Sequence, residues 1–268
     1  AEFSIPFIIQ DVANWGKIYY KPYIDLVYNW DFDGIHPENK DLTSPVMSIG
    51  QTISTSRVDW IENFRTGFSI SLTQSFSYNF YKNDFIPGIK GELQAFKSLK
   101  YLGLCTDIYM FAYLNGTEKI GGRLRGIRDD QYFSSESGES QLYACETPAA
   151  IVINFDIPIK LFATNWSKVP LINKISLMKY FNFELQVSPF IDVALTHNKA
   201  TDSNFSLKDG FYAGGLEVLV FPQKWKGMTV RASLGVDLGR LLLKGKINQD
   251  WRDSVSKYEL TIGLGLHY

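Results

Sequence analysis

The sequence has no long uninterrupted hydrophobic run, only two cysteines and almost no net charge. No segment approaches the roughly 18–20 consecutive apolar residues that a transmembrane helix needs, which excludes a helical membrane protein. Cys105 and Cys145 cannot build a multi-bridge scaffold and have no zinc-site spacing, and whether they bond to each other is left open. A formal net charge of -1 gives no sign of the basic patch that a nucleic-acid partner would call for.

Motifs for catalysis and for metal binding are also lacking. There is no Gly-x-Ser-x-Gly nucleophile motif, so we expect no enzymatic activity, and nothing in the sequence calls for a cofactor. An acidic stretch fits no EF-hand spacing, so a solvated loop is favoured over calcium binding. No metal site is expected from these acidic residues, Asp129, Asp130, Glu136 and Glu139. None is expected from the widely spaced histidines either, which are His36, His197 and His267.

Hydrophobic residues instead recur with a period of two, which is typical of β-strands with two unlike faces. In the last segment, 258–268, one face carries Tyr, Leu, Ile, Leu, Leu and Tyr, and the other carries polar residues and glycine. The chain also contains 19 Phe and 15 Tyr, a content that suits aromatic belts at the two surfaces of a membrane. This pattern favours a strand with a lipid-facing side and a polar inner side.

The same alternation predicts about ten strands, five on each side of a long link at residues 115–144. Many of these segments have 10–15 residues, longer than the roughly 5–6 of an average soluble strand and long enough for a tilted membrane crossing. We therefore predict an all-β, transmembrane, antiparallel β-barrel of about ten strands, with twelve as the alternative. Such a barrel should be closed, because an open edge cannot lie in hydrocarbon. The predicted strands lie near 17–30, 44–56, 64–76, 86–98, 101–114, 151–161, 181–193, 210–222, 229–238 and 258–268.

The predicted barrel occupies residues 17–268 and is placed in the bacterial outer membrane. Residues 1–16 are either a further strand or a segment at the periplasmic mouth. Ala1-Glu2 is a plausible start for an exported chain after removal of its signal peptide. A small interfacial helix is plausible within 163–180, from Leu171, Ile175 and Met178.

One motif in the 115–144 link resembles a known family. Leu124-Arg125-Gly126-Ile127 is similar to the Val-Arg-Gly-Phe/Tyr motif of the BamA superfamily, which includes outer-membrane insertases, two-partner-secretion transporters and bacterial surface antigens. In that family the motif lies in a long external loop folded back into the barrel lumen, and five strands follow it, as five follow it here. The resemblance therefore implies a long loop inside the lumen.

Two later segments extend the resemblance. Asn154-Phe155-Asp156-Ile157-Pro158 and Phe190-Ile191-Asp192-Val193-Ala194 are similar to acidic strand motifs of the family. The resemblance implies that Arg125 pairs with Asp156 and Asp192, both of which the alternation places on the polar face. A guanidinium in a lumen needs such carboxylates, and its planar fork suits two of them. Gly126 would allow a tight backbone path beside the arginine.

The resemblance implies a small member of the superfamily that acts in outer-membrane biogenesis or in translocation of protein or lipid. The expected partners are outer-membrane lipids and lipopolysaccharide, and either a protein substrate or a second copy of the chain. A passive pore or a structural barrel without transport activity is the alternative function.

Overall fold

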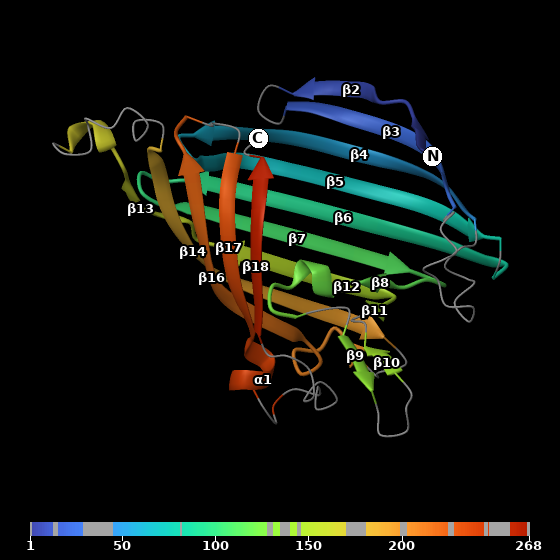
Figure 1. Ribbon diagram of the computed structural model, residues 1–268. Coiled ribbons are helices and arrows are strands. Elements are labelled where there is room, and N and C mark those ends of the chain that lie inside the picture. Colours follow the sequence, from blue (N-terminus) through green and yellow to red (C-terminus); the bar gives the residue numbers. More distant parts are fainter. Residues whose placement is uncertain are drawn as a thin grey trace.

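Alternating apolar and polar residues produce a fold that consists almost entirely of antiparallel strands. The computed structural model describes residues 2–12, 16–28, 45–80, 82–127, 131–134, 140–143, 146–169, 181–198, 203–224, 228–243, 246 and 258–266. Each long strand pairs antiparallel with the next long strand along the chain, so the sheet is a meander (Figure 1).

Ten long strands, of 8 to 16 residues, make up this meander. Five precede the 115–144 link and five follow it among the described residues, as predicted, and the predicted fold class is confirmed; four short strands also join this sheet. The strands are β3 (Gly16–Val27), β4 (Val46–Ile61), β5 (Phe64–Asn79), β6 (Asp84–Ser98), β7 (Gly103–Tyr113), β12 (Ala149–Asp156), β14 (Phe183–Asn198), β16 (Phe211–Pro222), β17 (Met228–Asp237) and β18 (Tyr258–Leu266).

Shorter elements lie between or beside the long strands. They are β1 (Glu2–Ser4), β2 (Phe7–Val12), β8 (Glu118–Lys119), η2 (Gly121–Arg123), β9 (Gln131–Ser134), β10 (Ser140–Tyr143), β11 (Glu146–Thr147), β13 (Ile159–Ala163), η3 (Trp166–Lys168), β15 (Ser203–Asn204) and α1 (Leu238–Leu242). Of these, β1, β2, β13 and β15 are the short strands that join the sheet of long strands. Within the described ranges no helix is both long and apolar enough to cross a membrane. The interfacial helix expected from Leu171, Ile175 and Met178 lies outside the described residues.

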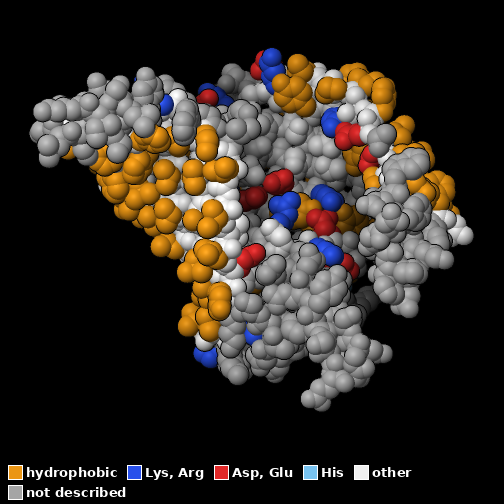
Figure 2. All heavy atoms as spheres, viewed as in Figure 1, with side chains coloured by type: hydrophobic (Ala, Val, Ile, Leu, Met, Phe, Trp, Pro, Cys, Tyr) orange, Lys and Arg blue, Asp and Glu red, His pale blue; other side chains and the backbone are white. Residues whose placement is uncertain are grey.

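Strand register gathers the apolar residues on the outer face of the sheet. Ile153 of β12, for example, lies opposite Ile108 of β7 on one side and Val193 of β14 on the other. On β18 the outward residues Tyr258, Leu260, Ile262 and Leu264 are 67 to 73% exposed. Figure 2 shows hydrophobic side chains over the outer wall on both sides of a hollow in which charged side chains gather. The sheet is thus apolar on its outer face, and its charged side chains gather on the inner face.

The expectation of a closed barrel is not met by the described strands. The sheet curves so that its last strands stand in front of its first ones (Figure 1), but β18 pairs with β17 alone among the described strands. The outer edge of β3 is taken by the N-terminal residues, since β1 and β2 both pair with it, from Glu2 opposite Asp25 to Val12 opposite Gly16. Backbone groups of β3 that β18 would need for closure are therefore already used by residues 2–12, which pair with β3 between Gly16 and Asp25.

Candidate functional site

The segment between β8 and residue 127 lies inside the curved sheet and is held there by apolar packing. Ile120, Leu124 and Ile127 are almost fully buried, at 0 to 1% exposure. They form one cluster with inward-facing side chains of four strands: Tyr109 and Phe111 of β7, Ala150 and Val152 of β12, Ala194 of β14, and Phe211 and Ala213 of β16. We call residues 120–127 the lumen loop. Its spacing of apolar residues fixes it to one wall and turns Arg125 toward the polar part of the lumen.

Arg125 is joined to two carboxylates from neighbouring strands. Its backbone N and its Nε donate to Asp192 Oδ2 at 2.9 and 3.0 Å, and its Nη2 donates to Asp192 Oδ1 at 2.6 Å. Its Nη1 and Nη2 donate to Asp156 Oδ1 and Oδ2 at 2.5 and 3.2 Å. One guanidinium therefore ties the lumen loop to both β12 and β14, an arrangement that the single ammonium of lysine could not reproduce.

This ion pair is partly buried, and its exposed side is that of Asp156. The Asp192 side chain has no exposed surface, and the Arg125 guanidinium lies 3.7 Å from the centre of the Phe190 ring. Burial alone would lower the pKa of Arg125, but the hydrogen bonds that it donates to Asp192 and Asp156 raise the pKa above its ordinary value, so the guanidinium stays charged. Loss of Arg125 would leave the buried Asp192 carboxylate without a compensating charge, which is the costly way to disrupt such a site.

Gly126 brings the lumen loop against the last two strands. It has a φ of +99°, and a Cβ added to it would lie 2.5 Å from the backbone N of Val236. Its own backbone N donates to Glu259 Oε2 of β18 at 3.1 Å. Both the conformation and the contact require glycine at this position. No role was predicted for Glu259, although its place on the polar face of β18 marks it as a residue that points inward.

Arg123 and Asn154 hold the loop from the opposite side. The Asn154 amide donates to the backbone O of Arg123 at 2.7 Å, and the Arg123 guanidinium lies 3.5 Å from the centre of the Tyr109 ring. The structure thus brings Arg125, Gly126, Asp156 and Asp192 together, and adds further contacts to them. Contacts of the lumen loop reach β7, β12, β14, β16, β17 and β18.

The turn between β4 and β5 makes a second set of contacts across the lumen, in addition to those of the lumen loop. Glu62 of this turn accepts from Lys160 Nζ at 2.8 Å, and the same Nζ lies 2.7 Å from Glu184 of β14. The backbone O of Asn63 accepts from the Gln186 amide at 3.5 Å. We call these contacts the floor of the lumen. They join residues about 100 positions apart, and no local sequence pattern signals them.

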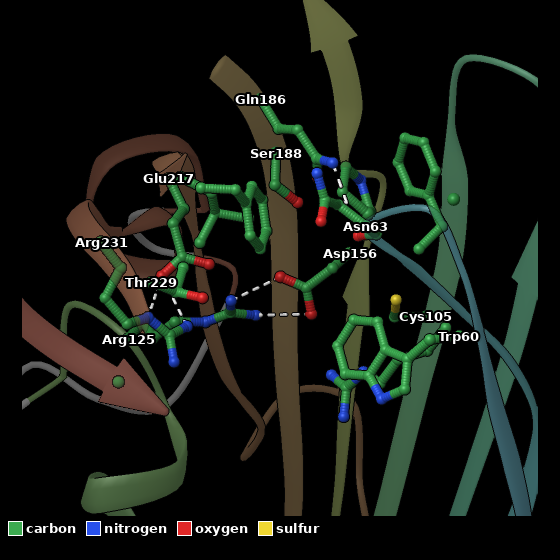
Figure 3. A pocket seen from close by; sticks show the side chains of 17 residues that line it. Trp60, Asn63, Cys105, Arg125, Asp156, Gln186, Ser188, Glu217, Thr229 and Arg231 are labelled. Atoms are coloured by element: carbon green, nitrogen blue, oxygen red, sulfur yellow. Dashed lines mark hydrogen bonds and ion pairs between the residues drawn. The ribbon is translucent and has the colours of Figure 1, made fainter. Parts of the chain in front are cut away.

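A cavity of about 310 Å³ lies between the floor and Arg125 (Figure 3). It is lined by residues from most of the wall, including Trp60, Asp156, Ser188 and Arg231. Arg231 is paired with Glu217, its Nε at 2.7 Å and its Nη2 at 2.6 Å from Glu217 Oε1. The site is thus a polar chamber whose charged side chains include paired arginines and carboxylates. Within the described ranges, no group of His, Cys, Asp and Glu side chains is arranged to hold a metal ion.

Of the other candidate residues, Cys105 lines the chamber, His197 is not part of its lining, and the rest lie outside the described residues. His197 stacks on Phe205 with ring centroids 5.8 Å apart, and Cys105 is a free thiol on β7. The remaining candidates lie outside the described residues: Cys145, His36, His267, Asp129, Asp130, Glu136 and Glu139.

Comparison with known proteins adds little to this geometry. No protein-family model matches the chain, and no curated protein does. Among solved structures, the NanC porin in a rhombohedral crystal form is similar, with a TM-score of 0.33 and 6% sequence identity, over 99% of this chain and 97% of that one. A similarity this distant does not bear on the function of the chain.

Proposed function

We propose that this chain is a small outer-membrane β-barrel of the BamA superfamily that acts in outer-membrane biogenesis or in translocation of protein or lipid. The observation that carries the proposal is Arg125, held by Asp192 and Asp156 through five hydrogen bonds that pin a long link inside the sheet. The placement in a membrane is supported by the outer face, whose large apolar side chains would be costly to leave in water.

The edge of the sheet supports a role beyond that of a static barrel. Among the described strands, β18 has no neighbour beyond β17, and β3 pairs with the N-terminal residues. An edge strand presents unpaired N–H and C=O groups that can pair with another strand. In hydrocarbon each such unpaired group costs on the order of several kcal/mol. A barrel with such an edge is suited to exchange strands or to disturb the surrounding lipid, which also makes outer-membrane lipids and lipopolysaccharide its expected partners.

Reconstitution tests this proposal directly. The full chain in liposomes should accelerate either the insertion of a urea-denatured outer-membrane barrel or the movement of fluorescent lipid between leaflets, compared with liposomes without protein. A disulfide that joins β18 to β2 through engineered cysteines should slow both processes, and reduction should restore them. Rates equal to those of protein-free liposomes in both assays would contradict the proposal.

A passive pore is the second candidate, and the polar chamber favours it. The inward faces carry paired charges such as Arg231 and Glu217, which would line an aqueous path. A pore predicts steady conductance of the unmodified chain in planar bilayers. Steady conductance together with no effect on insertion or on lipid movement would favour the pore over the proposed role.

A further inference from the structure

The chamber between the floor and Arg125 contains one cation that differs from the others. Arg125 and Arg231 both line it, and each is neutralised by carboxylates at hydrogen-bond distance. Arg65 of β5 also lines it, but among the described residues no carboxylate lies within ion-pair distance of Arg65. Asp107 of β7 lies close enough to interact with the charge of Arg65, but the two make no direct ion pair, so the guanidinium is available to a ligand.

Aromatic rings hold Arg65 in place. Its guanidinium carbon lies 4.1 Å from the centre of the Phe96 ring and 5.8 Å from the centre of the Trp60 ring. Ring contacts engage the face of a guanidinium, whereas its N–H groups donate in the plane of the group. The rings thus position the side chain, and no described residue accepts a hydrogen bond from its N–H groups. A planar fork of this kind matches a carboxylate or a phosphate.

Two buried polar atoms from the opposite wall face the same chamber without a partner. Among the residues that the structure describes, Ser188 Oγ and Gln186 Oε1 find no hydrogen-bond partner, and each residue is only 1% exposed. The Gln186 amide N already donates to Glu184 at 2.8 Å, so only its oxygen is left, and that oxygen requires a donor. Figure 3 shows the Ser188 hydroxyl pointing into the chamber. Unmet buried polar groups are rare in folded proteins and cost about 1–3 kcal/mol each.

We propose that this chamber binds a small hydroxylated anion. Arg65 would accept the carboxylate or phosphate group, and hydroxyl groups elsewhere on the ligand would donate to Gln186 Oε1 and pair with Ser188 Oγ. Because the Asp156 and Glu217 carboxylates are bound by arginines, they do not repel an anion as free carboxylates would. A volume of about 310 Å³ lies at the small end of the usual range for ligand pockets. This inference does not depend on strand exchange at the β18 edge.

Calorimetric titration of the full chain in detergent micelles tests the proposal with four probes. D-gluconate and glycerol 3-phosphate carry both an anionic group and hydroxyls, whereas propionate lacks the hydroxyls and glucose lacks the charge. Saturable binding is expected for one or both hydroxylated anions, with at least tenfold weaker binding of propionate and of glucose. Which of the two hydroxylated anions binds more tightly distinguishes a carboxylate ligand from a phosphate ligand.

Matched variants locate the binding. Arg65→Gln should weaken it at least tenfold, and Ser188→Ala should weaken it several-fold. The controls, Arg57→Gln on the outward face of β4 and Ser71→Ala on the inward face of β5 away from the chamber, should leave it unchanged. Heat-modifiability on gels shows whether each variant has folded. Absence of saturable binding by both hydroxylated anions would overturn the proposal, as would equal affinities in folded Arg65→Gln and in the unmodified chain.

Discussion

Gly126 of the lumen loop and Gly235 of β17 lie so close together that neither has room for a side chain. A Cβ on Gly235 would lie 2.5 Å from the carbonyl C of Arg125 and 2.6 Å from the N of Gly126. A Cβ on Gly126 would lie 2.6 Å from the carbonyl C of Gly235. These atoms belong to the backbone on both sides, so a small side-chain rearrangement could not relieve the contact. The position of Arg125 therefore depends on a glycine more than a hundred residues away.

Gly235→Ala should displace the lumen loop. Forcing a methyl group into a packed interior costs about 1–3 kcal/mol, so the midpoint of thermal unfolding should fall. Gly263→Ala is the matched control, because a Cβ on this glycine of β18 meets only Arg231 Cγ, at 3.7 Å. Equal midpoints for the two variants, measured by the heat-dependent shift of the band on gels, would show that the close approach does not constrain the loop.

The two aspartates should not contribute equally. The Asp192 side chain is fully buried and accepts three hydrogen bonds from Arg125, whereas the Asp156 side chain is 23% exposed and accepts two. Removing one partner of a buried pair costs about 3–5 kcal/mol, and water near Asp156 should reduce that cost. Asp192→Asn should therefore lower the free energy of unfolding in urea by more than Asp156→Asn does. The reverse order would argue against Asp192 as the main partner.

Leu124→Ala should destabilise the lumen loop through lost packing. Leu124 is 1% exposed, and truncating a buried leucine costs about 2–5 kcal/mol. Leu207→Ala, at a leucine that is 68% exposed, is the control and should change stability by less than about 0.5 kcal/mol. Urea unfolding followed by tryptophan fluorescence measures both. A Leu124→Ala variant as stable as the control would mean that the loop is not part of the core.

Acid should weaken the contact at the start of the link, in β8. Burial acts to raise the pKa of Glu118, but hydrogen bonds from Lys90 and Tyr109 outweigh it and hold the pKa below its ordinary value of 4.5. A carboxyl whose pKa is depressed on folding adds stability above its unfolded pKa and loses it as the pH falls through the folded value. The thermal midpoint should therefore fall below about pH 4.5 in the unmodified chain. The fall should be smaller in Glu118→Gln, and parallel pH profiles of the two proteins would contradict this.

The strands could be predicted from the sequence because a sheet with one apolar face and one polar face requires apolar and polar residues at alternate positions. Residues 258–266 alternate without exception, and the structure places Leu260, Ile262 and Leu264 outside and Glu259 and Thr261 inside. The acidic partners of Arg125 were expected from the family resemblance together with this alternation. The register places Asn154 opposite Asp192. Asp156 follows Asn154 by two residues on the same face of β12, so both carboxylates are within reach of Arg125.

The pairing at the edge of the sheet and the contacts across the lumen could not be predicted in the same way. Residues 2–12 are interrupted at Pro6 and show a register shift between Ile8 and Gln10, so no alternation marks them as the strand beside β3. The contact of Lys160 with Glu62 depends on how far the sheet curves, which local sequence does not encode. The need for glycine at position 235 becomes clear only from its contact with the backbone of Arg125 and Gly126.

The measurement that most directly tests the account is hydrogen–deuterium exchange of the peptide covering residues 120–127. The central claim is that Arg125, through Asp192 and Asp156, holds the lumen loop against the wall, with the backbone N of Arg125 itself bonded to Asp192. Exchange in this peptide should be slow in the unmodified chain and at least tenfold faster in Arg125→Ala, while peptides from β4 to β6 remain unchanged. Equally slow exchange in the folded Arg125→Ala variant would contradict the claim.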